Sequence, residues 1–336
     1  MHPRDNKPPF AGLEPDTVLD AIESLGFVTD GRLLALNSYE NRVWQVGRED
    51  QPDPLIAKFY RPGRWSDEAI AEEHGFSAEL AEAGISVVAP LLIDGHSLHK
   101  HAGYRFAVFS RQGGRAPELE SRATLSHLGR VLGQLHNVGA AGRFAHRPTI
   151  GIASHGRQAV AVLLDEGWVP SDLVPAFGAL SEHLLGALET AWERCRQPAT
   201  FRLHGDCHPG NILWREVQGQ GQAHFVDLDD CLTGPAIQDL WMLLSGEDRE
   251  QAEQLGWVLE GYRLFRDFDP AELNLIEPLR TLRMLHHAAW LARRWHDPAF
   301  PPAFPYFSGH GYWASLIGQL KEQLALLQHG SPIRLP

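Results

Sequence analysis

Residues 14–110 alternate between short apolar runs and polar turns, a pattern that predicts a sheet. The apolar run around Lys58 is bounded by prolines, and an Asp-Gly pair between two other runs predicts a hairpin. Five strands are expected: two within residues 32–47, joined by the turn 37–41, and one each within 54–62, 90–99 and 104–109. The order predicts one antiparallel sheet with a long helix inserted after the third strand.

Two helices are expected in the same part of the chain. The first covers residues 14–26, with Asp16 as its cap and Gly26 as its stop. The second follows Ser66, a favourable capping residue, and ends at Gly84.

After Gly114 the apolar positions change to a helical period. Leucines and a valine recur on one face of residues 124–139, which predicts an amphipathic helix. Further helices are expected over 157–196 (two), 236–246, 250–266, 275–295 and 311–327, with small strands within 201–228. The predicted fold class is α+β, with a bilobal, protein-kinase-like architecture. We expect an N-terminal nucleotide-binding lobe (1–112) and a C-terminal catalytic and substrate lobe (113–336).

Composition narrows the function classes. The 336 residues are 43% hydrophobic and 21% charged, as in ordinary globular proteins. A net charge of −12 argues against nucleic acid as the main partner. The sparse cysteines, Cys195, Cys207 and Cys231, do not form a disulfide framework, and no run of 18 apolar residues predicts a membrane span. We therefore expect a cytoplasmic protein without a membrane partner.

The stretch LHGDCHPGNILW, residues 203–214, concentrates the candidate chemistry. A structural zinc site would need a second Cys or His pair at suitable spacing, which the sequence lacks. The alternative is the spacing H-x-D-x-x-x-x-N, from His204 through Asp206 to Asn211. In kinases such a loop supplies an Asp near the acceptor hydroxyl and an Asn that coordinates Mg²⁺. This spacing predicts Asp206 as a catalytic residue and Asn211 as a metal ligand.

An acidic cluster follows the apolar run AHFV. Asp227, Asp229 and Asp230 compete for the role of main Mg²⁺ ligand, which kinases place at a strand end after the catalytic loop. Asp227 is favoured because it comes first after the apolar run, and Asp229 is the fallback. Three adjacent carboxylates would repel one another without a cation, which itself suggests a metal.

Lys58 is the candidate for binding the ATP phosphates, because a charge between apolar strand residues requires a partner. Glu72 and Glu73 on the following helix are both candidate partners. Glu73 is favoured because apolar residues at i+3 and i+7 place it near the buried face. The turn 37–41 lacks a glycine-rich pattern, so hydroxyls such as that of Ser38 and backbone N–H groups are expected to hold phosphates.

Several other residues have expected roles. Asp239 is predicted to brace the catalytic loop through hydrogen bonds. Adenine is expected against the segment from Phe109 to Gln112. On the amphipathic helix 275–295, packing or rim positions are expected for His286, His287 and Trp290. Arg293 and Arg294 are expected in solvent, with contact to an anionic substrate as the alternative.

Eight segments together resemble one family of bacterial stress-response Ser/Thr protein kinases, which have the aminoglycoside-phosphotransferase and choline-kinase type of fold. The segments are LNSYENRVWQV, AKFYRPGRW, EEHGF, HRPTIG, LHGDCHPGNILW, FVDLDD, GPAIQDLWMLL and RRWHDPAFP, and the resemblance covers residues 11–328. It implies Asp206 as catalytic base, Asn211 and Asp227 as Mg²⁺ ligands, and Ser38 in ATP binding. It also implies ATP as co-substrate, Ser/Thr protein substrates and a role in stress protection. A monomer is expected separately from the resemblance.

The sequence departs from eukaryotic protein kinases at three points. Gly205 replaces the Arg of H-R-D, and Asp227-Leu228-Asp229 replaces D-F-G. No A-P-E segment lies between Asp227 and Asp239, so activation-loop phosphorylation is not expected. Relatives with this layout phosphorylate small alcohols, which leaves a small-molecule phosphotransferase as the alternative.

Overall fold

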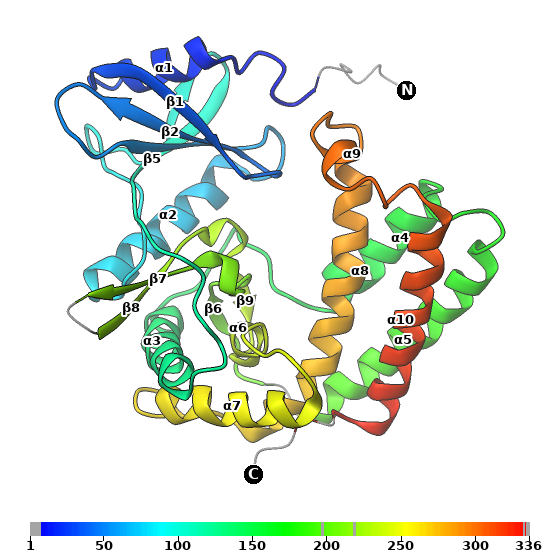
Figure 1. Cartoon of the computed structure of the whole chain (residues 1–336). Coiled ribbons are helices and arrows are strands. Elements are labelled where there is room, and N and C mark those ends of the chain that lie inside the picture. Colours follow the sequence, from blue (N-terminus) through cyan, green and yellow to red (C-terminus); the bar gives the residue numbers. More distant parts are fainter. Residues whose placement is uncertain (1–7, 196–197, 218–219, 332, 334–336) are drawn as a thin grey trace. The chain divides into compact units, whose positions relative to one another are not determined.

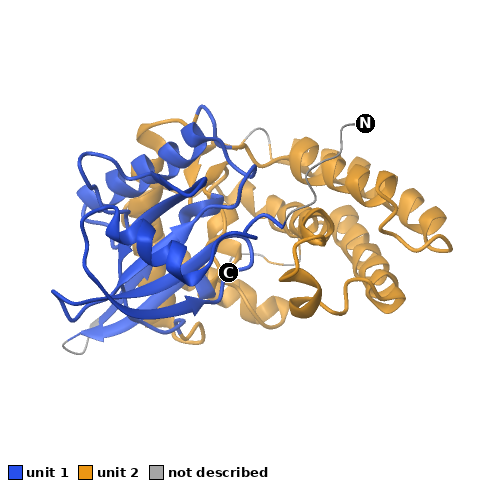
Figure 2. Cartoon of the chain, turned by 90° about the horizontal axis from the view of Figure 1, so that it is seen from above, with its two compact units in different colours: residues 1–117, 145–147, 210–230 blue, residues 118–144, 148–209, 231–336 orange. Residues whose placement is uncertain are grey.

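The structure is a computed structural model that describes residues 8–195, 198–217, 220–331 and 333 (Figure 1). The chain forms two compact units, coloured in Figure 2. Unit 1 comprises Met1–Pro117, Ala145–Arg147 and Gly210–Asp230, and unit 2 comprises Glu118–Phe144, Pro148–Pro209 and Cys231–Pro336. The division into functional lobes at residues 112 and 113 stays a prediction.

Unit 1 is built on a five-stranded antiparallel sheet with the order β1-β2-β3-β5-β4. Its strands are β1 (Thr29–Leu36), β2 (Arg42–Arg48), β3 (Leu55–Phe59), β4 (His99–His101) and β5 (Tyr104–Ser110). The predicted sheet is therefore confirmed. The hairpin turn between β4 and β5 lies at Ala102 and Gly103, both with positive φ. The predicted turn, Asp94-Gly95, also has positive φ at both residues but closes only a bridge between Ile93 and His96.

Two helices accompany the sheet, α1 (Pro15–Glu23) and α2 (Asp67–Glu82). Ser66 caps α2 as predicted, since its hydroxyl accepts a hydrogen bond from the Ala69 amide at 3.2 Å. The prediction that Asp16 caps α1 is wrong. Pro15 occupies the first helical position, which moves the cap to Glu14 and leaves Asp16 in the first turn.

The two faces of the sheet have different surroundings because side chains alternate along each strand. One face carries Leu55, Ala57 and Phe59 of β3, and these pack in an apolar cluster that includes Ile22 of α1. The opposite face carries Lys58 between Ile56 and Tyr60, and Tyr60 packs against Ile70 of α2. Lys58 therefore lies on the face that α2 covers.

A second hairpin of unit 1 carries residues of the candidate site. It consists of β7 (Ile212–Val217) and β8 (Gln220–Phe225), which pair antiparallel. Parallel bridging of Val87 with Phe225, and antiparallel bridging of Arg115 with Trp214, join it to the rest of unit 1. The hairpin brings the residue before it, Asn211, to the end of β8.

Unit 2 is mainly helical, as the apolar period predicts. Its elements are α3 (Arg122–Ala141), η1 (Ile152–Arg157), α4 (Gln158–Asp165), α5 (Val174–Arg194), β6 (Phe201–Leu203), β9 (Leu232–Gly234), α6 (Ile237–Trp241), α7 (Asp248–Tyr262), η4 (Pro270–Leu275), α8 (Ile276–Arg294), α9 (Phe300–Ala303) and α10 (His310–His329). Together with the sheet of unit 1, these helices confirm the predicted α+β fold class. Within the described ranges, no helix combines the length and apolar character needed to span a membrane.

Glycines allow α3 and α7 to pack closely. A Cβ atom at Gly129 of α3 would lie 1.9 Å from the Val258 carbonyl oxygen, and one at Gly261 of α7 would lie 1.8 Å from that of Ser126. Any larger residue at these positions would force the two helices apart. The close packing places the last residue of α7, Tyr262, within hydrogen-bonding distance of His136 on α3.

Candidate active site

Unit 1 contains a buried cluster of charged side chains around Lys58. Its Nζ lies 3.2 Å from Glu73 Oε1, 3.1 Å from Asp227 Oδ1 and 3.1 Å from Asp229 Oδ1. Burial lowers the pKa of Lys58, but Asp229, Glu73 and Asp227 outweigh it, so that the pKa is raised well above its ordinary value. Lys58 is therefore a permanently charged ammonium group held by three carboxylates.

The two neighbouring glutamates of α2 have different partners. Glu73 is buried and pairs with Lys58, and burial raises its pKa against the opposing effect of Lys58. Glu72 accepts backbone N–H bonds from Ala145 at 2.6 Å and from His146 and Arg147 at 2.9 Å each. Of the two candidate partners of Lys58, the structure therefore pairs it with Glu73.

Asp227 lies beyond the end of β8 in an unusual backbone conformation. Its φ of +59° is in the left-handed region, which costs a residue other than glycine about 1–2 kcal/mol. Its side chain is 55% exposed, in contrast to that of Asp229 at 4%. The Val226 amide donates to the Asn211 carbonyl oxygen at 3.0 Å, so Asn211 lies next to the residue that precedes Asp227.

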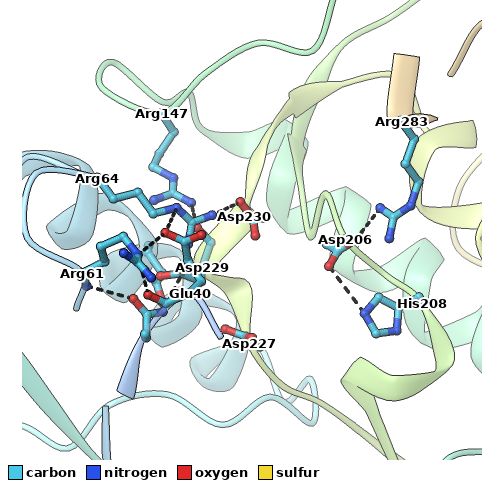
Figure 3. A network of polar contacts seen from close by, with 12 residues as sticks. Glu40, Arg61, Arg64, Arg147, Asp206, His208, Asp227, Asp229, Asp230 and Arg283 are labelled. Atoms are coloured by element: carbon cyan, nitrogen blue, oxygen red, sulfur yellow. Dashed lines mark hydrogen bonds and ion pairs between the residues drawn. The ribbon is translucent and has the colours of Figure 1, made fainter. Parts of the chain in front are cut away.

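Asp229 and Asp230 have cationic partners in the protein itself. Arg64 contacts both carboxylates (Figure 3), and Asn41 donates to Asp229 Oδ2 at 3.1 Å. Burial raises the pKa of Asp229, but Arg64, Lys58 and Arg147 together hold it below its usual range. The suggestion that the clustered carboxylates indicate a metal is thus corrected for Asp229 and Asp230, because Arg64 supplies the positive charge.

Arg147 is a further cation of this cluster, contributed by a short segment of unit 1 that is remote in sequence. Its guanidinium donates to the Asp229 carbonyl oxygen and lies 4.1 Å from the centre of the Trp65 ring. Sequence reasoning missed Arg64, Arg147 and Asn41. Their only sequence signal is their presence in the segments of the family resemblance, because an arginine in a loop does not reveal a distant partner.

Ser38 and Phe109, predicted to contact the nucleotide, also belong to unit 1. Phe109 pairs with Ile56, and Lys58 pairs with Val43, so all four side chains share the α2 face of the sheet. Val43, Ile56 and Phe109 are half-buried. Ser38 lies in the turn between β1 and β2 and is half-buried. The α2 face of the sheet therefore places the apolar side chains of Val43, Ile56 and Phe109 beside the ammonium group of Lys58.

Asp206, the predicted catalytic base, belongs to unit 2. Arg283 Nη1 of α8 donates to Asp206 Oδ1 at 2.6 Å, and His208 Nε2 lies 3.5 Å from Oδ2 (Figure 3). Burial raises the pKa of Asp206, but Arg283 and His208 outweigh it and the pKa is lowered. Asp206 is therefore an ionised carboxylate that is 25% exposed. Sequence reasoning assigned no role to Arg283.

The backbone before Asp206 is held by Asp239, as predicted. Asp239 Oδ2 accepts from the His204 amide at 2.9 Å, and Oδ1 accepts from the Gly205 amide at 2.8 Å. His136 Nε2 lies 3.1 Å from Asp239 Oδ2, and its Nδ1 lies 2.9 Å from the Tyr262 hydroxyl. Burial lowers the pKa of His136, so a neutral imidazole links α7 to the loop. Gly205 has a φ of +85°, which favours glycine at this position.

Cys207 and His208, the remaining Cys and His of the stretch 203–214 beside His204, lie in different environments. Cys207 is buried, and burial raises the pKa of its thiol well above the ordinary value. A protonated thiol is a poor metal ligand. His208 is half-exposed and lies near Asp206, as described above.

Comparison with known proteins identifies the family. The family model described as "Phosphotransferase enzyme family" matches residues 32–276. The chain belongs to this family. It is 44% identical over 331 residues to "Serine/threonine protein kinase RdoA" of Salmonella typhimurium, covering 98% of both chains. It is also 44% identical over 327 residues to "Stress response kinase A" of Escherichia coli K12, covering 97% of both. The phosphotransferase family and the resemblance to stress-response kinases are thereby confirmed.

Solved structures share the fold at low sequence identity. Amicoumacin kinase hAmiN has a TM-score of 0.70 at 18% identity, covering 94% of both chains. A microcompartment-associated aminopropanol kinase has a TM-score of 0.66 at 18% identity, covering 94% of this chain and 99% of its own. At this identity the likeness concerns the fold alone. Family and fold together make the chain a phosphotransferase of the kinase type, with its acceptor still to be assigned.

Proposed function

We propose that this phosphotransferase transfers the γ-phosphoryl group of ATP to Ser/Thr hydroxyls of protein substrates. The observation that carries the ATP-dependent part is the buried Lys58–Glu73 ion pair with the exposed carboxylate of Asp227 beside it. This is the arrangement that kinases use to hold nucleotide phosphates and their metal. The name of one relative at 44% identity, "Serine/threonine protein kinase RdoA", supports the protein acceptor.

Residues 1–112 would form the nucleotide-binding lobe. Lys58, oriented by Glu73, would bind ATP phosphates through its ammonium group. Phe109 would contact the adenine, since it lies on the same face of the sheet as Lys58. Ser38 would contribute a hydroxyl from the turn between β1 and β2.

Asn211 and Asp227 would hold Mg²⁺. Their amide and carboxylate oxygens are the hard donors that this ion takes, and the large exposed fraction of Asp227 suits an ion that keeps several water ligands. Asp229 fits less well, because Arg64 and Lys58 already occupy its carboxylate. The bound ion would neutralise charge on the phosphate oxygens.

In the catalytic lobe, residues 113–336, Asp206 would orient the acceptor hydroxyl and accept its proton. Its lowered pKa keeps it ionised at neutral pH, so it can accept a hydrogen bond from the hydroxyl. Because phosphoryl transfer depends mainly on positioning and charge neutralisation, Asp239 would contribute by fixing the loop that carries Asp206.

A small-molecule acceptor is the alternative. The names of structural neighbours motivate it, since they include an aminopropanol kinase and a choline/ethanolamine kinase family protein. We favour protein acceptors, and the name of the Escherichia coli relative supports a role in the bacterial stress response. That the enzyme is cytoplasmic and monomeric is part of the same proposal.

The test is incubation of the purified chain with labelled ATP and Mg²⁺. The acceptors are none, a generic protein, and a panel of amino alcohols and sugars, each with the wild type and with Asp206→Asn. Label on protein Ser/Thr that Asp206→Asn abolishes supports the proposal. Label only on a small molecule overturns the protein acceptor and leaves the phosphotransferase chemistry intact.

A further inference from the structure

The surroundings of Asp206 carry information about the charge of the acceptor. Arg283 donates to Asp206 Oδ1 at 2.6 Å, and 45% of the Arg283 side chain remains exposed. A guanidinium group has five N–H donors in a planar fork, so it can bind one carboxylate while it contacts a second anion. An acceptor that reaches Asp206, the proposed base, would therefore also meet the positive charge of Arg283.

Arg283 belongs to a stripe of residues on one face of α8, and within this stripe Trp290 is partly buried against the apolar core of unit 2. His287, Trp290 and Arg294 follow it at i+4, i+7 and i+11, a spacing that places all four on one helix face. The opposite face is buried and apolar, with Leu285, Ala288 and Ala292 in the core of unit 2. Within the stripe, Arg283 contacts Asp206 directly, so an acceptor near Asp206 would meet this residue.

His287 interacts electrostatically with both members of the Asp206–Arg283 pair. Burial and Arg283 lower its pKa, while Asp206 opposes them. Near neutral pH His287 is therefore an uncharged hydrogen-bonding group, and its ring lies against Trp290 at 5.5 Å. Of Arg283, His287 and Trp290, only Arg283 therefore carries a positive charge.

This arrangement disfavours a cationic acceptor. Aminopropanol, for which one structural neighbour is named, carries an ammonium group at neutral pH, and such a group needs a carboxylate partner. Here the Asp206 carboxylate already pairs with Arg283. An ammonium group close to the acceptor hydroxyl would compete with Arg283 for Asp206, whereas a carboxylate there would pair with the exposed guanidinium.

We propose that Arg283 selects an anionic acceptor: a Ser or Thr whose neighbouring residues in the substrate protein are Asp or Glu. The inference rests on the proposed protein-kinase function and adds the substrate class to it. The shared chemistry, a hydroxyl near a carboxylate, also occurs in small hydroxy acids, and the experiment separates these two sources.

The experiment compares three peptides that share one central serine and differ only in the flanking residues: glutamate, glutamine or lysine. Glycerate and aminopropanol serve as anionic and cationic small alcohols. Each acceptor is tested with the wild type, Arg283→Gln, Arg283→Lys, and Lys321→Gln as control. Lys321 is an exposed cation on α10 of the same unit, so its replacement makes the same change in net charge. The measurement is the ratio of kcat/KM between peptides, because a general loss of activity cancels in the ratio.

For the wild type and Lys321→Gln we expect the glutamate peptide to exceed the lysine peptide by about tenfold or more, equivalent to about 1.4 kcal/mol. The ratio should approach one in Arg283→Gln and recover in Arg283→Lys. Equal use of the peptides by the wild type, preference for lysine, or an equal loss for all peptides in Arg283→Gln would overturn the inference. Label on glycerate but on no peptide would support the charge selection and refute the protein acceptor. Label on aminopropanol alone would refute both.

Discussion

Asp239→Asn tests how the loop that carries Asp206 is held. Asp239 Oδ2 accepts from His204 N and His136 Nε2, and Oδ1 accepts from Gly205 N, all in a fully buried position. Asparagine retains one acceptor oxygen. Its best orientation keeps the two contacts of Oδ2 and turns its own N–H donors toward the Gly205 amide.

The cost follows from the lost contact. A hydrogen bond to a charged group contributes about 1.5–3 kcal/mol, and an unsatisfied buried donor costs about 1–3 kcal/mol. Relief of the buried charge offsets part of this, so we expect Asp239→Asn to lower the free energy of unfolding by about 3 kcal/mol. Because the loop positions Asp206, kcat should also fall by about 100-fold at a temperature where the variant is fully folded.

The assay is urea unfolding followed by circular dichroism, combined with the kinetics of labelled phosphate transfer. Asp248→Asn is the control, since it removes the same charge from the first turn of α7, where the residue is exposed. It should lower the unfolding free energy by no more than about 1 kcal/mol and leave kcat unchanged. If Asp239→Asn changes stability by less than about 0.5 kcal/mol and leaves kcat intact, the bracing role of Asp239 is refuted.

Three further predictions concern other parts of the structure. Glu73→Gln should lower ATP affinity about tenfold in a nucleotide titration, and unchanged affinity would contradict the role of the Lys58–Glu73 ion pair. The same substitution should lower the free energy of unfolding by only about 1–2 kcal/mol, because Asp227 and Asp229 still balance the charge of Lys58. Ser66→Ala should cost about 1 kcal/mol in urea unfolding through the lost cap of α2, and an effect near zero would refute the cap. Arg283 contributes to lowering the pKa of Asp206, so the activity of the wild type should fall only at acid pH. Arg283→Gln should shift the acid side of the pH–activity profile to higher pH. An unshifted profile would show that Arg283 does not act on the pKa of Asp206.

Much of the fold follows from local patterns in the sequence. The strands and helices arise where apolar period and turn residues agree, as in α2, where Ser66 and Gly84 mark the ends. The fourth strand is expected within residues 90–99, but β4 begins only at His99, and its turn into β5 has no Asp-Gly signal because Ala102 adopts a positive φ that its residue type does not favour. The Asp94-Gly95 signal correctly predicts a turn, but this turn is closed only by an isolated bridge between Ile93 and His96.

The residues of the candidate site also fall into two groups, those that local sequence patterns predict and those that they do not. Lys58, Asp206, Asn211 and Asp227 are recognisable because their spacing and their apolar neighbours are local features of the chain. The charge partners are not local: Arg64 meets Asp229 across 165 residues, and Arg283 meets Asp206 across 77. Only the tertiary structure reveals such pairs. They show that arginine balances part of the acidic cluster and that the proposed base, Asp206, has a cationic partner.

In the proposed mechanism, Asp206 serves transfer to the acceptor hydroxyl, while Lys58 and Asp227 bind the nucleotide and its metal ion. The most direct measurement is transfer of labelled phosphate from ATP to protein serine or threonine by the wild type and by Asp206→Asn, with ATP binding titrated for both. We expect Asp206→Asn to bind ATP with unchanged affinity and to lose most of its turnover. Near-wild-type turnover in Asp206→Asn would contradict the role of Asp206 in phosphoryl transfer.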